Sequence, residues 1–140
     1  MTVAYSLQET DMRNYTLDEL VKFAKDYQCA ELPISFSEDK YVRTPVYKDA
    51  TLEIVVICFS PGQTSSVHDH KGSCCAVKVV KGKILEQLFK DNGEYLEFVS
   101  NKYLNQGDVS VLDGTAIHQV SCLDKSGSVL LNFYSPPSKV

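Results

Sequence analysis

The chain contains only three histidines, and two of them, His68 and His70, are separated by a single residue. On a β-strand, residues i and i+2 point to the same face, so this pair can present two imidazoles to one metal ion. The third histidine, His118, lies in a segment predicted as strand, turn and strand. If the two strands face each other across a barrel, three neutral nitrogen ligands converge on one point. An isolated His-x-His pair is more often not a metal site, but the flanking glycines and the third histidine favour one here.

Strands must position these ligands, and most of the chain is predicted to form them. Thr16 and Glu19 make a capping-box pattern that begins one helix, with apolar residues at helical spacing as far as Tyr27. From Tyr41 onward, short apolar runs alternate with turn residues, which is typical of a β-sandwich or barrel. The predicted strands cover residues 41–47, 52–60, 67–80, 84–90, 95–99, 109–112, 117–122 and 129–135.

Two of these strands carry further information. Pro45 lacks a backbone donor, so the strand at 41–47 is expected at an edge of its sheet. The run at 52–60 is continuously apolar and rich in β-branched residues, which predicts a strand covered on both faces.

Length and composition limit the classes of protein. At 140 residues the chain suits a single domain over 1–140, with a helical and irregular segment at 1–40 and a barrel at 41–137. The net charge of -4 argues against a nucleic-acid surface, and no apolar run approaches the ~20 residues of a membrane helix. The N-terminus lacks the pattern of a secretory signal. Five cysteines without a C-x-x-C pair favour a reducing, cytoplasmic location, and we expect a monomer.

The spacing around the histidines resembles the two motifs of the cupins. The first is Gly62-x5-His68-x-His70-x4-Cys75-x6-Gly82, and the second is Gly107-x10-His118. Cysteine stands where many cupins have a metal-binding glutamate, and Asp113 and Thr115 replace the usual proline and glycine of the second motif. This resemblance implies a mainly β fold: a single cupin, jelly-roll-like β-barrel that holds a metal, preceded by a short helical segment.

Within the cupins, the chain resembles the cysteine dioxygenases. The matching residues are Tyr41-x-Arg43, His68-Asp69-His70, Cys75, His118 and Tyr134-Ser135-Pro136-Pro137. The resemblance implies non-haem Fe(II) held by the three histidines, with O2 as co-substrate. It implies conversion of L-cysteine to cysteine sulfinic acid, a small-molecule thiol bound by Arg43 and Tyr41, and catalytic roles for Tyr134 and Cys75, which form a thioether cross-link in the family.

One departure from the family keeps other functions open. Leu130 and Asn132 stand where the family commonly has serine and histidine on the face shared with Tyr134. Dioxygenation of another small thiol acid, such as 3-mercaptopropionate, is therefore an alternative, as is a metal-binding cupin sensor without oxygenase activity. A zinc hydrolase is a third, since three histidines and water also suit Zn2+. Against it, the nearby Asp69 is expected to face away from the metal by strand alternation.

Overall fold

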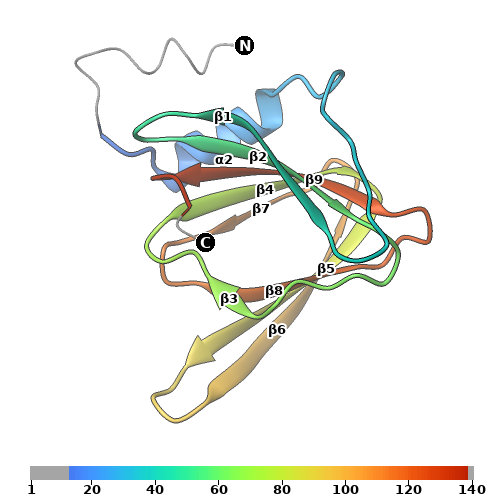
Figure 1. The fold of residues 1–140 in the computed structure, drawn as a ribbon. Helices are drawn as coiled ribbons and strands as arrows, with labels where there is room; N and C mark the ends of the chain where they lie inside the picture. The colour runs from blue at the N-terminus through green and yellow to red at the C-terminus, as the bar shows by residue number, and fades with distance from the viewer. Residues whose placement is uncertain (1–12, 139–140) are drawn as a thin grey trace.

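The computed structural model describes residues 13–138, which form one helix and nine strands in two sheets (Figure 1). The first sheet has the strand order β1-β2-β9-β4-β7, and the second has the order β3-β8-β5-β6. The elements are α2 (Leu17–Asp26), β1 (Val42–Lys48), β2 (Glu53–Phe59), β3 (His68–Asp69), β4 (Cys74–Lys81), β5 (Lys83–Asp91), β6 (Leu96–Asn105), β7 (Val109–Leu112), β8 (Ile117–Cys122) and β9 (Ser128–Ser135).

The two sheets face each other and enclose one apolar cluster, while the helix covers the outside of the five-stranded sheet (Figure 1). Every residue of β2 and of β9 is buried, which confirms the prediction for 52–60. These strands pack against the barrel interior on one face and against α2 and its neighbours on the other. The predicted mainly β barrel with a short N-terminal helix is confirmed.

The helix begins where the capping box predicted. The Thr16 side chain accepts a hydrogen bond from the backbone N–H of Glu19, and the Glu19 carboxylate accepts one from the backbone N–H of Thr16. Leu20 and Ala24 are fully buried against the five-stranded sheet. Strand β1 lies at the edge of that sheet, as Pro45 indicated, and its register slips between Pro45 and Tyr47.

The prediction of one strand over 67–80 is wrong. The chain forms β3 in one sheet, turns through Lys71 and Gly72, and continues as β4 in the other sheet. Both turn residues have positive φ angles, 52° and 94°, a conformation that glycine adopts without the Cβ clash of other residues. The sequence pattern did not reveal this break, because the residues before the turn and those after it both direct side chains into the same barrel interior.

The histidine strands do not meet across the barrel, the arrangement considered from the sequence. Strands β3 and β8 are antiparallel neighbours in the same sheet, and His68 lies directly opposite His118. Because opposed side chains in an antiparallel pair share a face, neighbouring strands bring the imidazoles together more closely than facing sheets would.

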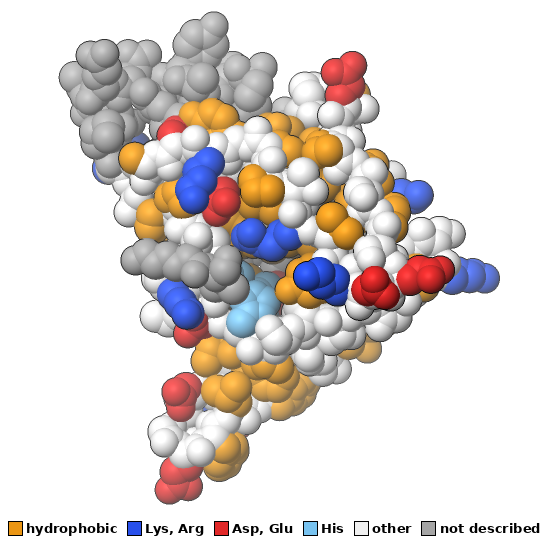
Figure 2. Space-filling model, in the orientation of Figure 1, with side chains coloured by type: hydrophobic (Ala, Val, Ile, Leu, Met, Phe, Trp, Pro, Cys, Tyr) orange, Lys and Arg blue, Asp and Glu red, His pale blue; other side chains and the backbone are white. Residues whose placement is uncertain are grey.

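Strand β6 is longer than the predicted 95–99, since it continues to Asn105. Its second half is mostly polar and exposed because β6 is an edge strand, so the apolar alternation that marks a half-buried strand is missing there. The β5–β6 hairpin projects from the barrel and carries exposed apolar side chains, visible at the bottom of Figure 2.

Two predictions concern features that residues 13–138 do not decide, and a third concerns membrane helices. Most of the stretch examined for a secretory signal, residues 1–12, lies outside the described range. The assignment of 1–140 to one domain, divided at residue 40, stays a prediction. Among residues 13–138, no helix has the length and apolar character needed to span a membrane.

Candidate metal centre

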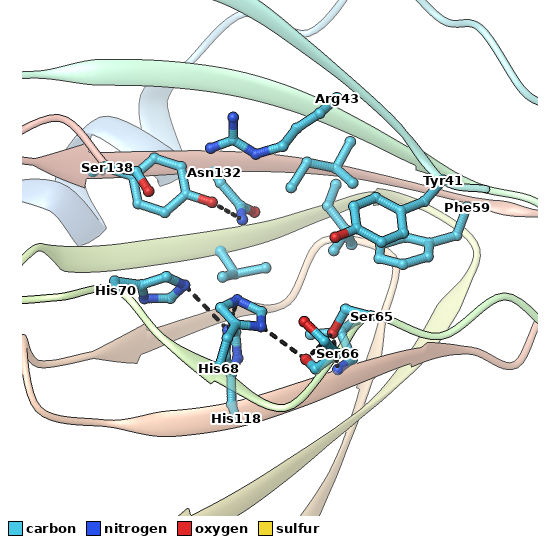
Figure 3. A pocket seen from close by; sticks show the side chains of 15 residues that line it. Tyr41, Arg43, Phe59, Ser65, Ser66, His68, His70, His118, Asn132 and Ser138 are labelled. Atoms are coloured by element: carbon cyan, nitrogen blue, oxygen red, sulfur yellow. Dashed lines mark hydrogen bonds between the residues drawn. The ribbon is translucent and has the colours of Figure 1, made fainter. Parts of the chain in front are cut away.

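The three histidines meet at one end of the barrel interior (Figure 3). The Nε2 atom of His118 lies 3.2 Å from Nε2 of His68 and 3.2 Å from Nε2 of His70. His70 and His118 are each only 2% exposed, and His68 is half-buried. A histidine is visible in the hollow on the face shown in Figure 2, so the cluster is reached from outside.

The backbone around Gly72 brings His70 into the cluster. His70 follows β3, and its carbonyl accepts a hydrogen bond from the backbone N–H of Ser73, which closes the turn into β4. The N–H of Gly72 donates to the carbonyl of Gly114, in the loop that leads to β8. The turn that carries His70 is therefore fastened to the loop that precedes His118.

Gly114 offers a test of this fastening. A Cβ at position 114 lies only 2.7 Å from the carbonyl oxygen of Gly72, and the obstruction is backbone that has no flexible end to move aside. We expect Gly114→Ala to push the His70 turn away, to destabilise the fold by about 1–3 kcal/mol and to weaken metal binding. Urea unfolding and a Co(II) titration measure the two effects. Gly93→Ala is the control: its positive φ of 95° strains the backbone, but a Cβ there meets nothing within 4 Å, so it destabilises the chain without displacing a neighbour. Equal loss of metal affinity in both variants contradicts the role of Gly114.

Electrostatics favour the neutral form of His68 and His70. Burial, together with the neighbouring histidines and Arg43, lowers the pKa of His70 to about 3. Burial also lowers the pKa of His68, against the raising effect of its bond to the Ser66 carbonyl. Neutral imidazoles are the form that binds metals, because the lone pair is then free.

The geometry of the nitrogen atoms fits a divalent metal ion. Metal–nitrogen bonds of about 2.0–2.1 Å at octahedral or tetrahedral angles separate two histidine nitrogens by about 2.8–3.4 Å. The two separations from His118, both 3.2 Å, fall within this range, and the ligand atoms of all three histidines lie within 4.8 Å of one another. The Nδ1 atom of His68 lies 2.8 Å from the carbonyl oxygen of Ser66, and Nδ1 of His118 lies 3.0 Å from Oε2 of Glu86. Since Nδ1 of each of these rings contacts a group outside the cluster, Nε2 is the nitrogen that faces the other histidines.

Glu86 was not among the predicted site residues, although the sequence contains a signal for it. It is fully buried on β5, between the inward-facing Ile84 and Leu88. A charged residue at an inward position of a strand needs partners, and here they are His118, Ser110 and, through Ser110, Lys102. Burial acts to raise the pKa of Glu86, but the hydrogen bond and charge of His118, with smaller contributions from Ser110 and Lys102, outweigh it, so that the pKa is lowered. Each of the two carboxylate oxygens therefore has a hydrogen-bond partner.

A cavity of about 200 Å3 separates the histidines from the opposite wall of the barrel. Arg43 and Asn132 lie on that wall above the histidines, and the stacked rings of Tyr41 and Phe59 close one side (Figure 3). Among residues 13–138, no carboxylate pairs with the Arg43 guanidinium, which lies 5.6 Å from the ring centre of Tyr134. Ser65 and Ser66, which the sequence did not single out, also line the cavity.

The last strand presents Leu130, Asn132 and Tyr134 to the cavity, as the alternation of the strand predicted. The Asn132 amide Nδ2 donates to the Tyr134 hydroxyl at 2.9 Å. Burial raises the pKa of Tyr134, with the neighbouring Cys75 adding to the effect, so its hydroxyl keeps its proton.

Cys75 is fully buried on β4 and lies directly opposite Tyr134 on β9. Directly opposed residues have Cβ atoms about 4.5–5.5 Å apart, so the thiol and the phenol ring are neighbours. Burial raises the pKa of the Cys75 thiol, so the sulfur is not a thiolate. The adjacent Cys74 is half-buried and packs against the outer cluster, as strand alternation requires.

The structure places all seven predicted site residues on or directly beside one cavity. Six of them line one cavity, namely Tyr41, Arg43, His68, His70, His118 and Tyr134, and Cys75 pairs with the last of these. Asp69, predicted to be structural, accepts a hydrogen bond from the backbone N–H of Lys71 within the turn. The individual roles of these residues stay predictions.

Comparison with known proteins identifies relatives of the chain. The chain is 28% identical over 109 residues to cysteine dioxygenase type 1 of Homo sapiens, which covers 73% of this chain and 54% of the human protein. The corresponding protein of Danio rerio is 28% identical over 116 residues, with the same coverage. The chain therefore spans about half the length of these relatives.

Solved structures show the same fold. An RmlC-like cupin protein from Desulfovibrio desulfuricans superimposes with a TM-score of 0.57 at 22% identity, covering 80% of this chain and 97% of that one. A cupin superfamily protein from Desulfitobacterium hafniense gives a TM-score of 0.60 at 17% identity, covering 79% and 94%. The family profile for cysteine dioxygenase type I matches residues 12–140. The chain therefore belongs to the cysteine dioxygenase type I family of cupin-fold proteins.

Proposed function

We propose that the protein is a non-haem Fe(II) thiol dioxygenase that converts L-cysteine and O2 to cysteine sulfinic acid. The observation that carries this proposal is the pairing of two features across one cavity. Three histidines converge on one side, and an arginine without a carboxylate partner in the described chain faces them from the other. A small molecule with a thiol at one end and a carboxylate at the other matches both.

The ligand set favours an anionic sulfur ligand. Fe(II), bound by His68, His70 and His118, would supply the redox chemistry that O2 requires. Three neutral imidazoles add no negative charge of their own, so the site attracts a substrate thiolate. Both atoms of O2 then end on the sulfur, and the sulfinate product contains all atoms of the thiol and of O2 without any external reductant.

Arg43 would hold the substrate carboxylate through two parallel N–H donors. This fixes the distance between the carboxylate and the sulfur, so the thiol is aimed at the histidine cluster. Lysine or glutamine at this position offers no such planar pair of charged donors. In the family, glutamine here goes with 3-mercaptopropionate, so Arg43 favours cysteine.

Tyr134 would present a neutral hydroxyl beside the reacting sulfur. Asn132 Nδ2 donates to the Tyr134 oxygen, so the phenol proton is free to point at the substrate. An amide cannot carry a proton onward as the imidazole of the relatives can. The family's thioether cross-link to Cys75 is compatible with the opposed positions of the two residues and would fix the tyrosine ring.

The cavity wall argues against the hydrolase alternative. None of the described residues that line it is aspartate or glutamate, so a zinc-bound water would find no general base there. Glu86 lies behind His118, and hydrogen bonds occupy both of its oxygens.

Oxygen uptake with L-cysteine tests the proposal. Protein loaded with Fe(II) under anaerobic conditions is expected to consume one O2 per cysteine and to give a product two oxygen atoms heavier, measured with an oxygen electrode and mass spectrometry. The metal-free protein is the control. Oxygen use with 3-mercaptopropionate but not with cysteine supports the alternative substrate, and no uptake with any small thiol, despite bound iron, supports a sensor.

A further inference from the structure

We propose that Glu86 is a positioning residue that fixes the orientation of His118 and places a negative charge behind the metal centre. This inference deepens the proposed function and rests on its metal site. Glu86 is fully buried, although an unpaired carboxylate is costly to bury, and the chemistry described above does not use it.

The carboxylate is held from both sides. Its Oε2 lies 3.0 Å from Nδ1 of His118, and its Oε1 accepts a hydrogen bond of 2.8 Å from the Ser110 hydroxyl. The Ser110 oxygen in turn accepts a hydrogen bond of 3.1 Å from the Lys102 ammonium. A chain of three contacts therefore runs from the surface of β6 to the metal ligand, and Glu86 cannot turn away from His118 without losing two of them.

The register of the strands fixes this arrangement. Glu86 lies opposite Val120 on β8, and Leu88 lies opposite His118, so Glu86 is the diagonal neighbour of the ligand on the inner face. A long side chain reaches such a diagonal neighbour readily. The alternation of β5 therefore directs the carboxylate toward the ring nitrogen that faces away from the cavity.

The other two histidines have different surroundings. His68 Nδ1 donates to a neutral backbone carbonyl, that of Ser66. His70 Nδ1 is buried and has no hydrogen-bond partner in the described chain. His118 is therefore the one ligand of the three whose Nδ1–H faces a charged acceptor, and it is expected to be the strongest electron donor of the set.

This charge has a consequence for the metal. Three neutral ligands do not compensate the positive charge of a divalent ion. The buried carboxylate of Glu86, behind His118, compensates part of that charge through the imidazole ring. Metal binding is strengthened, and the oxidised ion, which carries more positive charge, is stabilised relative to the reduced ion. Removing the charge while keeping the hydrogen bond should reverse both effects.

Glu86→Gln makes that change, because glutamine keeps the length and an acceptor oxygen but loses the charge. Glu97→Gln is the matched control, since it removes a carboxylate from β6 of the same sheet at an exposed position paired with Lys90. We expect Co(II) affinity, measured by competition with a chelator, to fall about 10–100-fold in Glu86→Gln and to change less than twofold in Glu97→Gln. The Fe(III)/Fe(II) midpoint potential should become more positive in Glu86→Gln alone.

A folded Glu86→Gln protein with unchanged metal affinity and unchanged potential overturns the proposal and leaves Glu86 a purely structural residue. A measurement on the unmodified protein guards against a variant that does not fold. In the Zn(II)-loaded protein, nitrogen-15 NMR of the histidine rings should show His118 protonated at Nδ1 and metal-bound at Nε2. An unprotonated Nδ1 on His118 also overturns the proposal.

These readouts use neither a thiol nor O2. A protein whose metal affinity depends on Glu86 but which consumes no oxygen therefore contradicts the proposed function alone. Active dioxygenase with no effect of Glu86→Gln on affinity or potential contradicts only the role of Glu86.

Discussion

Replacing His70 by alanine is expected to abolish stable metal binding and, with it, thiol-dependent oxygen consumption. His70 is 2% exposed, and its Nε2 lies 3.2 Å from that of His118, at the point where the three rings meet. Two remaining imidazoles hold a divalent ion weakly, so affinity should fall by more than the about 10–100-fold typical of losing an outer partner. Metal content after dialysis and a Co(II) titration measure the loss.

Asp69→Asn is the control for this change. Asp69 lies between the two ligands in sequence, yet its carboxylate accepts a hydrogen bond within the turn and does not line the cavity. The variant should keep both metal and activity, and thermal unfolding of the metal-free proteins shows whether either change disturbs the fold. If His70→Ala binds metal with an affinity within tenfold of that of the unmodified protein, His70 is not a ligand and the three-histidine centre is contradicted.

Replacing Arg43 by glutamine should have the next largest effect, and it should act on the substrate alone. Hydrogen bonds to charged groups contribute about 1.5–3 kcal/mol, so kcat/KM for L-cysteine should fall about 10–150-fold. Most of the loss should appear in KM, because Arg43 holds the substrate carboxylate before and during the reaction. Steady-state oxygen uptake at several cysteine concentrations separates the two constants, and metal content should not change.

The chain offers a matched control, since Arg13 is its only other arginine. Arg13 is exposed and bonds to Glu19 at the start of α2, so Arg13→Gln should leave kcat/KM for cysteine unchanged. Arg43→Lys keeps the charge but loses the paired donors, and an intermediate value is expected. If kcat/KM in Arg43→Gln stays within threefold, the carboxylate binds elsewhere.

The sequence by itself determined the class of fold and most of the candidate site. Turn residues and apolar runs predicted the strands because both patterns are local, and the capping box at Thr16 and Glu19 predicted the start of the helix for the same reason. The His-x-His pair and the third histidine predicted a metal site because the residue types that bind metals are few, and the resemblance to the cysteine dioxygenases added Tyr41 and Arg43.

Only the tertiary structure decided how these residues meet. The pairing of β3 with β8, which sets His68 opposite His118, joins segments about fifty residues apart, and nothing local specifies that register. The same holds for Glu86, whose partners His118 and Ser110 come from two other strands. A local pattern shows which face of a strand is buried, but long-range pairing alone decides what each buried side chain contacts.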